Sequence, residues 1–200
     1  LYTMKKYDNI CKNIHLPAQS GSNRILELMN RSYTREWYLD RIKSIRSILG
    51  DDCGISQDMI AGFPTETEED HQETLALMDY VKYHFGYMYA YSERPGTLAA
   101  KKIVDDVPEE VKQKRLSEII AKQREHRQFR TAEYLGKTLC VLVEKTSKKF
   151  DTQWSGRTSQ NTVVVFPKEK YQIGDFVDVK IENCTSATLI GSGLDYSKSI

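Results

Sequence analysis

A change in sequence periodicity at Gly136 constrains the fold of this chain more than any other feature. Before it, short apolar runs alternate with segments whose apolar residues recur every three or four positions. The short runs predict strands over residues 9–16, 54–60 and 87–91. The longer segments predict helices after residue 22, over residues 34–49 and from residue 67, where Thr67 and Asp70 fit a capping box. This order of elements predicts parallel βαβ units.

A long helix and a β module complete the chain. The helix is predicted from Pro108, which suits a first turn, to about Leu135. After Gly136, β-branched runs are separated by clusters of Gly, Ser, Asn and Lys; they cover residues 138–144, 162–166, 175–181 and 188–190. Such a pattern predicts a small β-barrel. We therefore expect an α/β domain over residues 1–135, a barrel over 136–196 and a tail over 197–200.

The charge and the cysteines restrict the partners. The formal net charge is +1, so a nucleic acid would have to meet a local basic patch. Cys11, Cys53, Cys140 and Cys184 lie far apart, without a nearby His at metal spacing. They predict reduced, mostly buried thiols in a cytoplasmic protein, and neither disulfides nor a metal site. No apolar run approaches the ~20 residues of a membrane span, so no membrane partner is expected. Because the chain starts at Leu1, we expect it to be part of a longer protein.

The stretch IAGFPTETEED, at residues 60–70, combines an apolar run, a turn and a burst of acids. In parallel α/β sheets, ligands bind at the loops that follow the strands. Gly62 permits a close backbone approach, Phe63 offers a flat apolar surface and Pro64 fixes the turn. The last three acids are explained by the positive end of the following helix. Glu66 precedes that helix, and it suits a ligand site as well as a structural role.

Two further strand-end loops belong to the same rim. The loop QSGS, at residues 19–22, offers an amide and two hydroxyls to a sugar or phosphate. It also fits an ordinary loop leading into a helix, with Ser22 as N-cap. Arg94 could bind a carboxylate or phosphate through two hydrogen bonds, or simply face solvent. These residues alone mark a pocket without naming its ligand.

Motifs in a fixed order carry a resemblance to a known family. They are HLPAQSGS at 15–22, LMNR at 28–31 with YTR at 33–35, DMIAGFP at 58–64, YSERPGT at 91–97 and VPEE at 107–110. Over nearly the whole chain, this order resembles the radical S-adenosylmethionine methylthiotransferases. The resemblance implies the second half of a TIM-like partial barrel of parallel βα units, the trailing long helix, and then an OB-like TRAM barrel that binds RNA.

The resemblance also implies functional residues. Those that it places near S-adenosylmethionine are Gln19, Ser20, Gly21, Ser22, Asp58, Ile60, Gly62, Phe63, Pro64 and Glu66. Those expected at the substrate or RNA are Tyr91, Arg94, Lys145, Lys148, Lys149, Trp154, Arg157 and Lys168. Basic turns with interleaved aromatics suit structured RNA, although a plain soluble surface has the same pattern. The bases of the long helix are expected to be mainly solvated; they are Lys114, Arg115, Lys122, Arg124, Arg127 and Arg130.

Within the family, RPGT at 94–97, GRTSQN at 156–161 and VVVF at 163–166 favour one branch. That branch methylthiolates C2 of N6-isopentenyladenosine at position 37 of tRNA, next to the anticodon. The resemblance implies the anticodon stem-loop as substrate and a flavodoxin or ferredoxin as electron donor. Two alternatives stay open. One is a sibling enzyme acting on threonylcarbamoyladenosine in tRNA or on a ribosomal-protein aspartate. The other is a non-catalytic tRNA-binding module.

One departure from the family concerns its iron. The CxxxCxxC triad that holds the reducing [4Fe–4S] cluster does not occur in this sequence, and neither do the three cysteines that hold the auxiliary cluster. Three closely spaced thiolates are needed for such a cluster. We therefore expect both clusters only in a full-length enzyme. This chain is expected to supply no catalytic residue and no metal ligand, and to be inactive alone.

Overall fold

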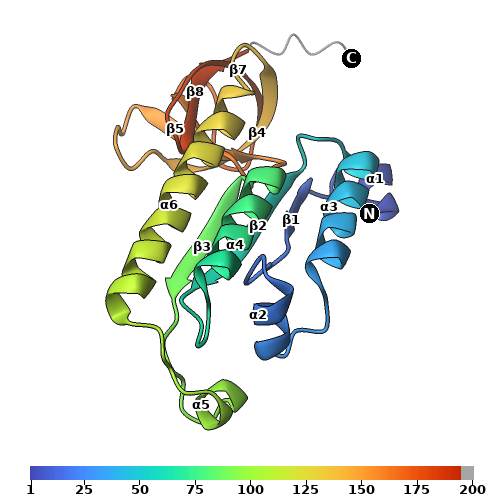
Figure 1. Cartoon of the computed structure of the whole chain (residues 1–200). Coiled ribbons are helices and arrows are strands. Elements are labelled where there is room, and N and C mark those ends of the chain that lie inside the picture. The colour runs from blue at the N-terminus through green and yellow to red at the C-terminus, as the bar shows by residue number, and fades with distance from the viewer. Residues whose placement is uncertain (195–200) are drawn as a thin grey trace.

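The computed structural model describes residues 1–194 and begins with a parallel sheet of strand order β1–β2–β3 (Figure 1). The strands are β1 (Asn13–His15), β2 (Gly54–Ala61) and β3 (Phe85–Ala90). The helices around them are α1 (Tyr2–Lys6), α2 (Asn23–Leu28), α3 (Arg35–Leu49) and α4 (Glu68–Val81). The predicted βαβ order is therefore confirmed. The capping box that starts α4 is also confirmed, with Thr67 and Asp70 each bonded to the other's backbone amide.

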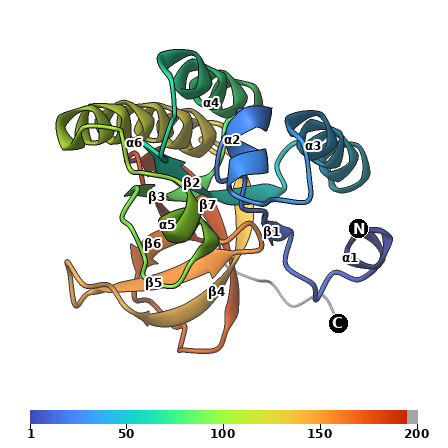
Figure 2. The same cartoon turned by 60° about the horizontal axis from the view of Figure 1, so that its bottom comes forward.

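Helices cover one face of the sheet (Figure 2). The core between them is apolar because α3 and α4 each turn one apolar stripe toward the strands. Tyr38 and Ile42 of α3, Met59 of β2 and Met78 of α4 are all buried there. Ile119 of the long helix joins the same core. The sheet is thus packed on the helix side.

The long helix connects the two halves of the chain. After the short α5 (Leu98–Lys102), α6 (Glu109–Ala132) runs along β3 and leads into the barrel (Figure 1). The helix ends before the expected Leu135, because Tyr134 turns its ring into the barrel core. The expectation of solvated bases is wrong for Arg115 and Arg130, which are buried. Both guanidinium groups are stabilised by carboxylate and carbonyl partners.

Residues 138–193 form a closed barrel of strand order β4–β5–β6–β8–β7. Its strands are β4 (Thr138–Thr146), β5 (Gln153–Thr158), β6 (Val163–Pro167), β7 (Phe176–Cys184) and β8 (Thr188–Gly193). The sequence did not predict β5, because QWSGRT lacks a β-branched run. Gly156 allows β5 to lie close to β4, since a Cβ there would overlap the Leu142 carbonyl. The partial parallel barrel followed by a small closed β-barrel is confirmed.

The prediction of mostly buried thiols is wrong. Only Cys53 is buried among the four, and burial raises the pKa of its thiol to about 11. Cys11 and Cys140 are exposed, and Cys184 is half-buried. Cys140 faces outward because the strand alternation of β4 turns Val141 inward.

Residues 1–194 contain neither a membrane-spanning helix nor a cluster of metal ligands. No helix there is long and apolar enough to cross a lipid bilayer. Within the same part of the chain, no group of three or more His, Cys, Asp and Glu residues could hold a metal ion. The expected tail, residues 197–200, and the last two residues expected in the barrel lie outside the described residues.

Candidate functional site

A cavity of about 750 Å³ lies where β2 and β3 end, and we call it the strand-end pocket. Gln19, Asp58, Ile60 and Phe63 line it from the sheet side. Tyr89 and the following segment, which includes Tyr91 and Arg94, form another part of its wall, together with residues 28–31. The structure therefore brings four of the ten predicted cofactor residues, and two of the predicted substrate residues, into one pocket. As contacts of a ligand, all of them stay predictions.

The pocket lining includes a carboxylate, that of Asp58, and an aromatic corner. The carboxylate oxygen Oδ2 of Asp58 lies 3.5 Å from Nε2 of His15. The other oxygen, Oδ1, is buried and has no hydrogen-bond partner among the described residues. Phe63 and Tyr91 meet edge to face, with ring centroids 5.1 Å apart. An unpaired acceptor beside flat apolar rings suits a ligand with both a donor group and an aromatic ring.

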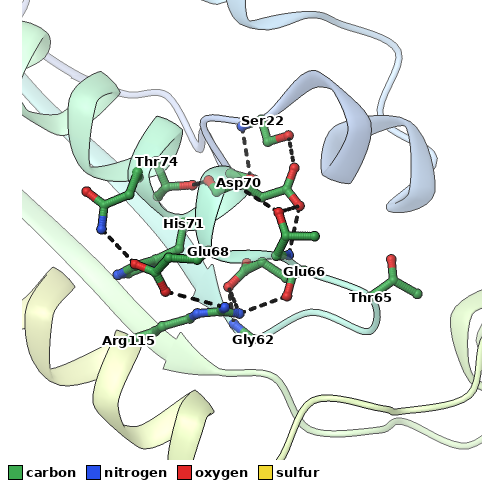
Figure 3. Close-up of polar contacts among 12 residues, drawn as sticks. Ser22, Gly62, Thr65, Glu66, Glu68, Asp70, His71, Thr74 and Arg115 are labelled. Atoms are coloured by element: carbon green, nitrogen blue, oxygen red, sulfur yellow. Dashed lines mark hydrogen bonds and ion pairs between the residues drawn. The ribbon is translucent and has the colours of Figure 1, made fainter.

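The QSGS loop is held from behind by α4 (Figure 3). The Ser22 hydroxyl donates to Asp70 at 2.6 Å, and the Gly21 amide donates to the Thr74 hydroxyl at 2.9 Å. The Ser20 hydroxyl lies 3.3 Å from the same Thr74 oxygen. None of Ser20, Gly21 and Ser22 lines the strand-end pocket, and all three are buried. The hydroxyls of Ser20 and Ser22 and the amide of Gly21 are thus bonded inside the chain.

Asp70 is the centre of this network. It accepts hydrogen bonds from Ser22, from Arg24 and from both the backbone amide and the side-chain hydroxyl of Thr67. Burial opposes ionisation, but the hydrogen bonds from Arg24 and Ser22 outweigh it, so the pKa of Asp70 lies well below its usual range. The carboxylate therefore stays charged and ties the loop before α2 to the start of α4.

Glu66 and Gly62 attach the Gly-Phe-Pro loop (residues 62–64, the GFP loop below) to the long helix (Figure 3). Glu66 accepts from the Gly62 amide at 2.9 Å and from Arg115 at 3.1 Å. Burial raises the pKa of Glu66, although these two partners act against the shift. Gly62 has φ +71°, and a Cβ on it would overlap the side chain of Lys112. The close backbone approach that Gly62 permits is therefore to α6 and not to a ligand. Neither Gly62 nor Pro64 lines the strand-end pocket.

Sequence reasoning missed Lys112 and Arg115 as parts of the site's support. A signal was available, because the buried polar positions of α6 recur at helical spacing. They are Lys112, Arg115, Gln123, His126 and Arg130, with the apolar Ile119 in the same stripe. Charged side chains are rarely placed in a core unless they are paired, so the sequence predicts inward positions for Ile119 and Gln123 but not for the charged members of the stripe.

A second cavity, of about 440 Å³, lies on the outside of the barrel, and we call it the barrel-face pocket. Lys145, Lys148, Lys149 and Arg157 line it together with Phe150. Its other lining residues include Val163, Val165 and Ile190. Four of the six basic and aromatic residues predicted for the barrel's RNA contacts therefore share one basic, partly apolar pocket.

The remaining two, Trp154 and Lys168, lie outside that pocket. The Lys168 ammonium is 4.3 Å from the Trp154 ring centroid and donates to the Thr146 hydroxyl. The Trp154 indole donates to the Tyr171 carbonyl and packs on the barrel core. The sequence had suggested that Trp154 and Arg157 lie in turns, but both belong to β5.

Comparison with known proteins identifies both halves. Residues 1–78 match the model of the radical SAM superfamily, and residues 132–194 match the TRAM domain. A protein of Flavobacterium johnsoniae named tRNA-2-methylthio-N(6)-dimethylallyladenosine synthase is 62% identical over 98% of this chain. A protein of the same name from Amoebophilus asiaticus is 62% identical over 96% of the chain. The chain belongs to the radical SAM methylthiotransferase family.

Length and structure comparisons define what part of the family is present. The chain spans about two-fifths of the length of these curated relatives, 41% and 39% respectively. Among solved structures, coproporphyrinogen III oxidase of Escherichia coli, a radical SAM enzyme, matches with a TM-score of 0.50 and 16% identity. The match covers 93% of this chain and 46% of the other. At this identity, it shows the radical SAM fold and nothing about the substrate.

Proposed function

We propose that this chain is the part of a tRNA-modifying enzyme that forms one wall of the cofactor site and binds RNA. The full-length enzyme would methylthiolate C2 of N6-isopentenyladenosine at position 37 of tRNA by radical SAM chemistry. The observation that carries the proposal is the presence, in one chain, of the strand-end pocket and the basic barrel-face pocket. The names of the relatives, at 62% identity, support this substrate over those of the sibling enzymes.

The strand-end pocket fits S-adenosylmethionine. Phe63, Tyr91 and Ile60 offer apolar surface for an adenine ring, and the Asp58 carboxylate in the same lining can accept from a hydroxyl or amino group. When bound, S-adenosylmethionine supplies the radical and methyl chemistry of the family. The chain's own residues orient the cofactor and exclude water from it. Gln19 helps to set this wall, because its backbone bonds to both Asp58 and Ile60.

The iron–sulfur clusters do not fit this chain. Its four cysteines lie far apart in sequence, and residues 1–194 hold no group of three or more suitable ligands. We propose that the ligands of both [4Fe–4S] clusters belong to the remainder of a full-length protein, and that this chain alone is inactive. The same proposal includes a flavodoxin or ferredoxin as electron donor and the cytoplasm as the place of action.

We also propose the domain division at residues 135 and 136. Support comes from the end of α6 at Ala132 and the start of β4 at Thr138. Tyr134 packs in the barrel core, so the transition between the domains is only a few residues long. Limited proteolysis of the full-length protein would test this, with first cuts expected in the residues that join α6 and β4.

The activity is tested by expressing the full-length protein in cells that lack their own methylthiotransferases. Nucleosides from the tRNA are then analysed by mass spectrometry. We expect 2-methylthio-N6-isopentenyladenosine to appear. A methylthio group on threonylcarbamoyladenosine, or on ribosomal protein, would assign the chain to a sibling enzyme. No methylthio group on any of them, with intact tRNA binding, would favour the non-catalytic module.

RNA binding by the barrel-face pocket is tested with Lys148→Gln/Lys149→Gln. Each phosphate contact adds about 0.7 to 0.9 to the slope of log affinity against log salt, so losing two should lower it by about 1.4 to 1.8. The measurement is tRNA binding by the full-length protein at several salt concentrations. Lys5→Gln/Lys6→Gln, an exposed pair on α1, is the matched control. An unchanged slope in the first variant would remove the barrel-face pocket from the RNA interface.

A further inference from the structure

The second face of the sheet carries a row of aromatic side chains. Along β3, Gly86 lies against Gln57 and Gln123 on the α6 side of the sheet. Side chains of a strand alternate, so every second residue points to the opposite face. These residues are Phe85, Tyr87, Tyr89 and the following Tyr91, which we call the aromatic row. Phe85, Tyr87 and Tyr89 are 38%, 52% and 54% exposed.

The aromatic row connects the two ends of the sheet. Tyr89 and Tyr91 line the strand-end pocket. Phe85 and Tyr87 line another cavity, of about 400 Å³, which lies between the beginning of the sheet and the barrel; we call it the junction pocket. Their rings meet edge to face, with centroids 4.9 Å apart. Neighbours in the row are separated by about 6.6 Å along the strand.

The junction pocket is lined by three arginines. They are Arg127, Arg130 and Arg157, and no Asp or Glu lines the pocket among the described residues. Arg130 and Arg157 each also pair with a glutamate outside the lining, Glu133 and Glu144. The Arg127 guanidinium lies 5.5 Å from the Phe85 ring centroid, and its Nη2 donates to the Ala187 carbonyl of the barrel. Arginines beside exposed aromatic rings favour an anionic ligand that also has flat rings.

The same charge continues onto the barrel. Arg157 and Val163 line both the junction pocket and the barrel-face pocket. The basic surface proposed to bind RNA is therefore continuous with the aromatic row, and the row ends at the pocket proposed for the cofactor. The barrel lies at the end of the sheet opposite α5 (Figure 1), so the aromatic row is an exposed surface that leads from one pocket toward the other.

We infer that single-stranded RNA from the anticodon loop lies along the aromatic row. Its bases stack on Tyr87 and Tyr89, and its backbone is held by Arg127 and Arg157. The inference rests on the proposed function and adds Phe85, Tyr87, Tyr89 and Arg127 to the RNA interface. The polar residues beside the row agree with RNA better than with a protein segment packed on this face. Two of the three register partners are polar, Ser56 opposite Phe85 and Asp58 opposite Tyr87, and the third is Ile60 opposite Tyr89.

The test measures binding of an anticodon stem-loop RNA to the full-length protein, without S-adenosylmethionine. Tyr87→Ala/Tyr89→Ala should weaken binding at least about tenfold, because two stacking surfaces are lost. Tyr87→Phe/Tyr89→Phe keeps both rings and should bind like the unchanged protein. Tyr80→Ala on α4 is the matched control. Tyr80 is 48% exposed, and α4 packs on the sheet face opposite the aromatic row. A duplex of the same stem without its loop should bind equally to all four proteins.

Each outcome decides something. A loss confined to the stem-loop RNA and restored by phenylalanine supports the inference. Equal binding by all variants, or a loss that also affects the duplex, overturns it while the proposed function stands. If the unchanged protein does not bind the stem-loop, the proposed function fails first. Should the double alanine variant unfold, Tyr89→Ala alone carries the test, with a weakening of at least about threefold expected.

Discussion

The residues predicted to touch the cofactor fall into two regions that differ in how their polar atoms are used. In the first, Ser20, Ser22 and Glu66 are buried and bonded to α4 or α6. In the second, the wall of the strand-end pocket, Asp58 keeps an oxygen without a partner among the described residues. A buried polar group that is already bonded gains little from a ligand, whereas an unpaired one gains a full hydrogen bond. We therefore propose that the first region acts as a scaffold and that the second faces the ligand.

The largest expected effect is in the scaffold, at the Glu66–Arg115 pair. Glu66→Ala leaves Arg115 buried without its closest carboxylate and should lower the free energy of unfolding by about 3–5 kcal/mol. Urea unfolding of the full-length protein measures it. Glu69→Ala, an exposed acid in the first turn of α4, is the control and should cost about 1 kcal/mol or less. Equal costs for the two variants would contradict the division into two regions.

A smaller effect is expected from Asp70, and it depends on pH. The folded pKa of Asp70 lies below the ordinary 3.8, so its stabilising effect is complete above about pH 5. It is lost as the pH falls through 3.8 toward the folded value. Asp70→Asn should therefore cost about 2 kcal/mol near neutral pH, and this difference should shrink in acid.

Urea unfolding between pH 3 and pH 7 tests the Asp70 prediction. The exposed Asp8→Asn provides a control with no comparable change. If the cost of Asp70→Asn were the same at all pH values, its charge would not hold the network together.

The smallest effect on stability is expected in the pocket wall. Asp58→Asn replaces one oxygen and should change the free energy of unfolding by less than about 1 kcal/mol. Affinity for S-adenosylhomocysteine should nevertheless fall about tenfold, because a hydrogen bond to a charged group is lost. Isothermal titration of the full-length protein measures this affinity. A large loss of stability with unchanged affinity would place Asp58 in the scaffold instead.

Local patterns were enough to predict most of the fold. The capping box at Thr67 and Asp70 is formed as the sequence indicates, since its partners are only three residues apart. The switch to a closed barrel after α6 follows from runs of β-branched residues. β5 was missed because its place depends on the neighbours β4 and β6, and Gly156 matters only where Leu142 comes close.

By itself, the sequence determined the order of strands and helices, the strand-end position of the GFP loop and the family motifs. Only the tertiary structure decided which polar residues of the strand-end loops are already hydrogen-bonded within the chain. Glu66 and Arg115 are 49 residues apart, and Ser22 and Asp70 are 48 apart, so no local pattern reveals that they pair. The aromatic row is similar, because alternation shows that its rings share a face, and only packing shows that the helices cover the other one. Burial depends on contacts between distant segments, and those contacts separate scaffold from site.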